Sequence, residues 1–181
     1  MHICVYCAAS NHVSDTYFAA ARALGTGLAR RGWPLVYGGG SVGLMGAVAE
    51  AVQAAGGTVI GIIPQALLDR EVAYLQASEL IVTGTLRERK RLMDERADAF
   101  VALPGGFGTL EELLEIMTLR QLAYHDKPIT IINIGGYFDA LLDQFARIFA
   151  EGFAHGRYQD LYTVVGSVEE ALELLSHSDG S

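Results

Sequence analysis

Short apolar runs alternate along this chain with longer segments in which apolar residues recur every three or four positions. The short runs are typical of buried parallel strands, and the longer period is typical of amphipathic helices. The predicted strands cover residues 2–7, 34–37, 58–63, 80–82, 99–103, 129–132 and 162–165. The predicted helices cover residues 15–31, 44–55, 87–96, 109–124, 137–151 and 168–175, and a loop with a short helix is expected in 65–78.

Strands and helices alternate over the whole length, which favours one architecture. It is a doubly wound, mostly parallel sheet with helices on both faces, that is, a Rossmann-like α/β fold. No linker or internal repeat interrupts the pattern, so residues 1–181 are expected to form a single domain with a flexible tail after about residue 176. Asp15 is the expected N-cap of the first helix.

Composition and charge exclude several classes of protein. The chain has 181 residues, of which 51% are hydrophobic, and this is enough for a sizeable core. Its net charge of −8 argues against nucleic-acid binding, which needs a basic surface. No apolar run approaches the roughly 20 residues of a membrane span, and the N-terminus lacks a signal-peptide pattern. We therefore expect a cytoplasmic protein that binds neither nucleic acid nor membrane.

The two cysteines, Cys4 and Cys7, form a C-x-x-C pattern that can indicate a redox or metal site. Both fall in a predicted strand, where this spacing places them on opposite faces. No second cysteine pair completes a zinc site, and the five histidines show no ligand spacing. We expect no metal and no cofactor.

The most informative segment is 103–112, Leu-Pro-Gly-Gly-Phe-Gly-Thr-Leu-Glu-Glu, between a predicted strand and a predicted helix. A helix that starts in such a loop presents unpaired N–H groups and the positive end of its dipole. Glycines let the backbone approach a ligand closely, so a phosphate is the expected ligand. Thr109 and Glu112 also have the spacing of a capping box, which is the structural alternative for these two residues.

A second glycine cluster, residues 38–43, matches the dinucleotide pattern G-x-G-x-x-G. An NAD-binding protein also needs an acidic residue at the end of the next strand, and that strand ends in Pro64. We therefore exclude an NAD-dependent dehydrogenase. Gly39 and Gly40 are expected to contribute to a mononucleotide site, and the alternative is a purely structural turn.

Five of the thirteen Lys and Arg residues lie in the predicted helix 87–96. The spacing of Arg89, Met93 and Arg96 places them on one side of this helix, which precedes the strand of the phosphate loop. We expect this side, with Met93 as a substrate contact, to reach the loop. Arg87 and Arg91 are interpreted as part of a solvated face.

These residues resemble the Lonely guy (LOG) family of cytokinin-activating phosphoribohydrolases, whose members are often mislabelled lysine decarboxylases. The resemblance rests on P-G-G-x-G-T-x-x-E at 104–112, on Arg89-Lys90 upstream, and on G-G-G-S-x-G-L-M-G at 38–46. It extends from Ile3 to about Gly152, with Cys-Ala-Ala-Ser at 7–10 where the family usually has Cys-Gly-Ser-Ser.

The resemblance implies a homodimer that hydrolyses the N-glycosidic bond of an N6-substituted adenosine 5′-monophosphate. By match to the motifs, Arg89 and Glu112 would be the catalytic pair. The residues that would line the nucleotide site are Glu71, Lys90, Gly105, Gly106, Phe107, Gly108, Thr109, Leu110, Glu111 and Thr118. A Glu112 carboxylate could stabilise positive charge on the ribose and orient a water, with Arg89 fixing that carboxylate or holding substrate oxygens.

Two other functions compete with this hypothesis. A nucleotide-binding carrier protein would explain the glycines and cations but not the pairing of Arg89 with Glu112. A pyridoxal-phosphate decarboxylase needs a Schiff-base lysine. The chain has only Lys90, near the expected phosphate, and Lys127, at the entrance of a strand, so we exclude this chemistry.

Overall fold

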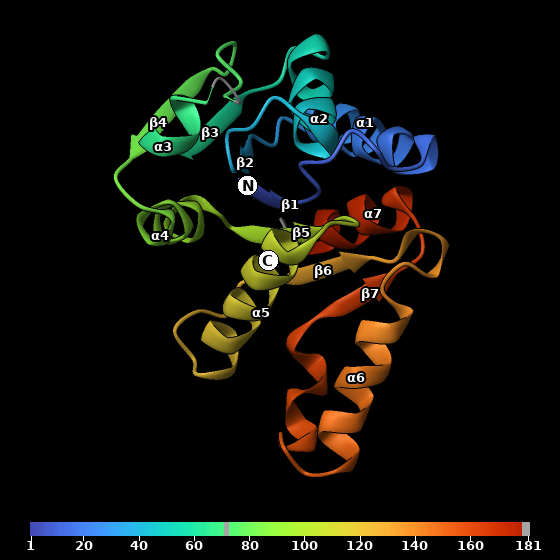
Figure 1. Cartoon of the computed structure of the whole chain (residues 1–181). Helices are drawn as coiled ribbons and strands as arrows, with labels where there is room; N and C mark the ends of the chain where they lie inside the picture. The colour runs from blue at the N-terminus through green and yellow to red at the C-terminus, as the bar shows by residue number, and fades with distance from the viewer. Residues whose placement is uncertain (71–72, 179–181) are drawn as a thin grey trace.

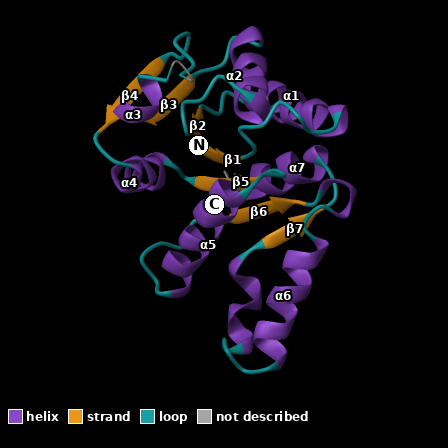
Figure 2. Cartoon of the chain, viewed as in Figure 1, coloured by secondary structure: helices purple, strands orange, loops and turns teal. Residues whose placement is uncertain are grey.

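The computed structural model describes residues 1–70 and 73–178, and its centre is one sheet in which every strand pairing is parallel (Figures 1 and 2). The sheet order is β4-β3-β2-β1-β5-β6-β7. The strands are β1 (Ile3–Tyr6), β2 (Leu35–Tyr37), β3 (Val59–Pro64), β4 (Glu79–Thr83), β5 (Ala99–Ala102), β6 (Ile129–Ile132) and β7 (Thr163–Val165). The doubly wound Rossmann-like prediction is confirmed.

The helices form a layer on each face of this sheet (Figure 1). One layer consists of α1 (Asp15–Arg30), α2 (Gly43–Ala54) and α7 (Val168–Ser178). The other consists of α4 (Leu86–Arg96), α5 (Phe107–Gln121) and α6 (Asp139–Ala150). Shorter helical turns are α3 (Gln65–Leu68), η1 (Ile134–Gly136) and η2 (Gly156–Leu161). Within the described ranges, no helix is long and apolar enough to cross a bilayer.

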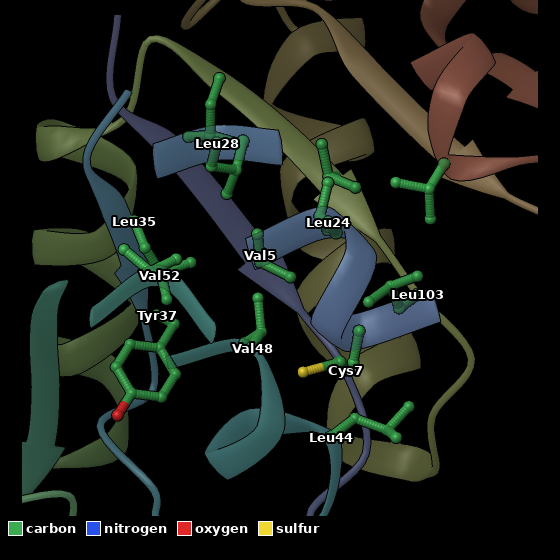
Figure 3. Close-up of a cluster of buried hydrophobic side chains, with 14 of the residues drawn as sticks. Val5, Cys7, Leu24, Leu28, Leu35, Tyr37, Leu44, Val48, Val52 and Leu103 are labelled. Atoms are coloured by element: carbon green, nitrogen blue, oxygen red, sulfur yellow. The ribbon is translucent and has the colours of Figure 1, made fainter. Parts of the chain in front are cut away.

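Each face of the sheet has its own apolar core, and the two cysteines separate between them. Cys7 packs with Leu44 and Leu103 in the core beneath α1 and α2 (Figure 3). Cys4 lies in the core beneath α4 and α5. Both thiols are free, and burial raises the pKa of each well above the ordinary value. The predicted opposite-face placement is confirmed, and two buried protonated thiols suit packing rather than redox chemistry.

The direction of winding reverses between β1 and β5, which are neighbours in the sheet but far apart in the chain. Ligands of such sheets bind at this switch point, beyond the carboxyl ends of the strands. Glycine is required at the start of α2, in the segment that follows β2, where Gly43 has φ of +62°. A Cβ there would lie 2.5 Å from the backbone nitrogen of Ser10, so only glycine lets α2 approach the loop after β1.

Several helix ends differ from the sequence-based expectation. The N-cap of α1 is Ser14, whose hydroxyl accepts the Thr16 N–H, while Asp15 occupies the first turn. The Asp15 prediction is therefore wrong by one residue, although a carboxylate there still suits the helix dipole. α6 starts at Asp139 rather than at Tyr137, because two left-handed glycines of η1 precede it. α7 continues to Ser178, so the tail predicted after residue 176 is helical up to that point, and 179–181 lie outside the described residues.

Candidate active site

Three loops meet at the switch point, and backbone hydrogen bonds join them. The Ala8 N–H after β1 donates to the Pro104 carbonyl after β5 at 3.2 Å. The Ala8 carbonyl in turn accepts the N–H of Leu44, the second residue of α2, at 2.9 Å. The Gly43 N–H donates to the Asn11 side chain at 2.8 Å. The glycine-rich segments after β2 and β5 are thus tied to the same β1 loop.

α5 begins in the second of these segments with its first amides unused. Gly106 is the N-cap, and it contributes no side-chain cap. Over residues 1–70 and 73–178, the amides of Gly106, Phe107, Gly108 and Thr109 have no hydrogen-bond acceptor. Gly106 and Gly108 border open space, since a Cβ on either would meet no atom within 4 Å. This is the geometry of an anion site at a helix start.

The capping-box prediction for Thr109 and Glu112 is wrong. The helix already starts at Phe107, so Thr109 lies inside its first turn. The Thr109 side chain is buried and folds back against Gly105, where a Cβ would come 2.0 Å from the threonine hydroxyl oxygen. Both residues are therefore committed to contacts other than the helix cap, and Glu112 pairs with an arginine.

That arginine is Arg89 of α4, and the pair is almost completely buried. Arg89 Nη2 lies 2.6 Å from Glu112 Oε1, and the two side chains are only 12% and 10% exposed. A Cβ on Gly38 would be 3.3 Å from Arg89 Nη1, so the first glycine cluster makes room for the guanidinium. Arg89 Nε is buried and has no partner among the described residues. One donor of the guanidinium is thus unpaired in the described part of the chain, although it is closed off from solvent.

Burial raises the pKa of Glu112 from its ordinary value of 4.5 to about 7, and the charge of Arg89 opposes this shift. Glu111 nearby adds to the rise, while Lys90 reduces it. A carboxyl group that titrates near neutral pH can exchange a proton with water or substrate under physiological conditions.

The raised pKa also predicts a pH-dependent contribution to stability. The folded state holds the Glu112 proton more tightly than the unfolded state, so this contribution is complete below about pH 4.5 and is lost as pH rises through about 7. Relative to Glu112→Gln, the wild-type free energy of unfolding should fall by about 3 kcal/mol over this interval. Urea unfolding of both proteins at a series of pH values measures the difference. A difference that stays constant or grows with pH would contradict the shift.

Lys90, the neighbour of Arg89, bridges α4 to the outer side of α5. Its ammonium group pairs with Glu111 and with Glu115. Burial opposes the charge of Lys90, but these two pairs raise its pKa. Arg96 does not reach the loop, because it bonds to Glu79 of the edge strand β4 at 2.9 Å. Of the two arginines on the predicted face, only Arg89 is therefore in the site.

A cleft of about 180 Å³ separates α4 from α5 and has Glu112 in its wall. Arg87 and Arg91 line it as well, so the solvated face proposed for them borders the site. Tyr6 of β1 also lines it, and burial raises the pKa of the Tyr6 phenol. No sequence pattern indicates this cleft, since its walls come from two helices and a strand that are far apart in the chain.

The other predicted substrate contacts divide into two groups. Phe107 is 93% exposed beside the free amides, and Leu110 is half-buried. Gly39 and Gly40 are buried behind the loop, and Gly39 has φ of +74°. Glu71 lies outside the described residues.

Two predicted contacts are not brought to Glu112. Met93 is 1% exposed and packs in the core beneath α4, so it cannot touch a ligand from there. Thr118 donates to the Leu114 carbonyl at 2.7 Å and lines a separate apolar pocket between α5 and α6.

Two alternative chemistries can be compared with the described residues. No cluster of three or more His, Cys, Asp or Glu able to hold a metal ion is found in the described part of the chain. Lys127, the alternative Schiff-base lysine, is occupied by the backbone and side chain of Asp94, at 2.6 and 3.0 Å. The site therefore consists of an anion site at the start of α5 and a buried carboxyl–guanidinium pair at Glu112, within the first turns of the same helix.

Comparison with known proteins identifies relatives over most of the chain. Residues 45–175 match the family model described as "Possible lysine decarboxylase". The chain is 43% identical over 173 residues to cytokinin riboside 5′-monophosphate phosphoribohydrolase LOG2 of Arabidopsis thaliana, which covers 96% of this chain and 81% of that protein. It is 44% identical over 176 residues to the cytokinin riboside 5′-monophosphate phosphoribohydrolase of Mycobacterium tuberculosis, with coverages of 97% and 94%.

Solved structures show the same fold. The molybdenum cofactor carrier protein of Chlamydomonas reinhardtii superposes with a TM-score of 0.76 at 25% identity, covering 99% of this chain and 98% of that one. The molybdenum cofactor binding protein of Rippkaea orientalis gives a TM-score of 0.74 at 24% identity, with coverages of 97% and 95%. The family model matches most of this chain, and the relatives named above are more than 40% identical to it. The chain therefore belongs to the LOG family of phosphoribohydrolases, whose family model is described as a possible lysine decarboxylase.

Proposed function

We propose that this protein hydrolyses the N-glycosidic bond of an adenosine 5′-monophosphate, including N6-substituted cytokinin nucleotides, to the free base and ribose 5-phosphate. The observation that carries the proposal is the buried pair between Arg89 of α4 and Glu112 of α5, the helix whose first amides are free. The relatives above 40% identity that are named for this reaction support it.

In the proposed reaction the C1′–N9 bond breaks and its electron pair leaves with the base. Positive charge develops on the ribose, and the ionised Glu112 carboxylate stabilises it. A water oxygen then bonds to C1′ while Glu112 accepts one of the water protons, and Glu112 passes this proton to the departing base. A carboxyl group with a pKa of about 7 is suited to accept and return this proton.

Arg89 has a different role in this proposal. A guanidinium does not release its proton near neutral pH, so it cannot be the general acid. Its bond to Glu112 Oε1 fixes the direction of that carboxylate and keeps part of it ionised.

A carrier protein is the second candidate, since solved carriers share the fold. A carrier needs a binding loop, but it does not need a carboxyl group held in a buried pair with a pKa near neutrality. Release of free base from AMP by the purified protein separates the two functions, because a carrier would bind the nucleotide and return it unchanged.

The free amides predict that the 5′-phosphate is required. Its binding energy fixes the ribose against Glu112, so removing it should reduce kcat/KM as well as affinity. We expect kcat/KM for AMP to exceed that for adenosine by about 10³-fold, as several charge-assisted hydrogen bonds are lost. A purine-release assay with both substrates measures the ratio. Equal values would show that the amides at the start of α5 do not bind the phosphate.

We further propose that the protein is a cytoplasmic homodimer. Three exposed apolar side chains on one side of α5, Phe107, Leu114 and Leu122, support a self-association surface next to the site. Thr118 also lies on α5 and lines the apolar pocket between α5 and α6. A second copy packed on this surface would therefore lie close to Thr118 and this pocket.

A further inference from the structure

The hydroxyl of Tyr137 donates a hydrogen bond of 2.5 Å to the Gly105 carbonyl in the loop after β5. Tyr137 comes from the loop after β6, the neighbouring strand in the sheet. The preceding carbonyl, that of Pro104, accepts the Ala8 N–H from the loop after β1. Two successive carbonyls of the glycine-rich loop are thus each held by the loop of an adjacent strand.

The loop that carries Tyr137 is itself tightly constrained. The Asn133 side chain accepts the Phe138 N–H at 2.7 Å and donates to the Asp139 carboxylate at 2.7 Å. Gly135 and Gly136 both have positive φ, +61° and +74°, which L side chains rarely adopt. This conformation turns the chain so that the Tyr137 ring faces the loop after β5.

The ring is also fixed from the side. It makes edge contacts with Tyr17 of α1 and with Phe138, with ring centroids 5.8 and 5.0 Å apart. These contacts restrict the ring, so that its hydroxyl reaches the Gly105 carbonyl with little freedom. A ring restricted in this way can hold the carbonyl in one direction.

The direction of the carbonyl decides where the next amide points. The described residues contain no cis peptide, and in a trans peptide the C=O and the following N–H point in opposite directions. With its carbonyl held by Tyr137, the Gly105–Gly106 peptide must aim the Gly106 N–H away from Tyr137. That N–H has no acceptor in residues 1–70 or 73–178 and borders open space.

Among residues 1–70 and 73–178, no other group forms a hydrogen bond with the Gly105 carbonyl or the Gly106 N–H. This peptide joins two glycines, and the lack of a Cβ on either side lowers the steric barrier to rotation of the peptide plane. Pro104 and Thr109 fix the ends of the segment through their own contacts, but not the plane between them.

We propose that Tyr137 is a positioning residue that keeps the Gly106 amide directed at the 5′-phosphate. The inference rests on the proposed function, in which the amides at the start of α5 bind that phosphate. Without the hydroxyl, the Gly105–Gly106 peptide rotates, and its carbonyl replaces an amide at the anion. The loss falls on phosphate recognition and leaves the Arg89–Glu112 pair in place.

The test is Tyr137→Phe, which removes one oxygen and keeps the ring contacts. We expect kcat/KM for AMP to fall about tenfold, the cost of one charge-assisted hydrogen bond, while the value for adenosine changes less than about twofold. The Kd of ribose 5-phosphate, measured by calorimetry, should rise by the same factor as the AMP loss. Tyr17→Phe is the matched control, since it removes a hydroxyl from the same ring cluster, and it should leave all three values unchanged.

Wild-type release of base from AMP tests the proposed function separately. If the wild type is active and Tyr137→Phe loses nothing, or loses equally on AMP and adenosine, the inference is overturned and the function stands. If the wild type binds ribose 5-phosphate but releases no base, weaker binding by Tyr137→Phe supports the inference while the function fails. A wild type that neither binds nor hydrolyses overturns both.

Discussion

Glu112→Gln is expected to lower kcat for AMP by about 10³-fold, within the range of acid–base and electrostatic catalysis by one carboxyl group. Glutamine keeps the size of the side chain and can still accept the bond from Arg89. It can neither carry the negative charge that stabilises the ribose nor take a proton from water. The measurement is steady-state release of free base, with circular dichroism to show an intact fold.

Glu95→Gln provides the control for a lost carboxylate near the site. Glu95 is exposed on α4 and pairs with Arg91 at 2.5 Å. Its substitution should leave kcat within about twofold, since exposed pairs contribute little. A Glu112→Gln enzyme with near-wild-type kcat would reduce Glu112 to a structural partner of Arg89.

Arg89→Met should lower kcat/KM for AMP by about 10²-fold, through loss of a charged hydrogen bond and of carboxylate orientation. It should also change the pH profile. Activity requires ionised Glu112, so it is lost as pH falls through the pKa of about 7. Arg89 opposes the rise in this pKa, and without it the acidic limb of the kcat profile should move to higher pH.

Arg96→Met is the matched control for this substitution. Arg96 lies on the same helix, but it pairs with Glu79 away from the loop. Its replacement should leave both kcat/KM and the acidic limb in place. If the acidic limb of the kcat profile lay at the same pH in Arg89→Met as in the wild type, Arg89 would not control the ionisation of Glu112.

The strands of the sheet could be predicted because each one is determined by a short, continuous segment of the sequence. Strands buried on both faces appear as continuous apolar runs, as in β5 and β6, and the intervening helices have an apolar side. The strand order could not be read from these patterns. It depends on which neighbours bury the most surface, and this placed β1 between β2 and β5.

The start of α5 was harder to predict, because one pattern fits two structures. Thr109 and Glu112 have capping-box spacing, yet Gly106 serves as N-cap and Glu112 turns to Arg89. A tertiary ion pair outweighed the local cap. The pairing of Arg89 with Glu112 was suggested by family resemblance, and their spacing in the chain alone does not bring them together.

The sequence does not predict the role of Tyr137, because the pattern of its segment indicates the start of a helix. Residues 135 and 136 are both glycine at a strand end, which could have indicated a left-handed turn. No sequence pattern indicates that the following tyrosine bonds to a carbonyl after another strand. The prediction for Met93 is wrong in the other direction. Its helix face is predicted to bind substrate, but the Met93 side chain packs in the apolar core.

The central claim is that the amides at the start of α5 hold the 5′-phosphate and thereby place the anomeric carbon at Glu112. A crystal structure of the Glu112→Gln protein with AMP tests this most directly. The account predicts phosphate oxygens within hydrogen-bonding distance of the amides of residues 106–109, with C1′ facing the side chain at 112. A phosphate bound elsewhere, or a ribose turned away from that side chain, would contradict it.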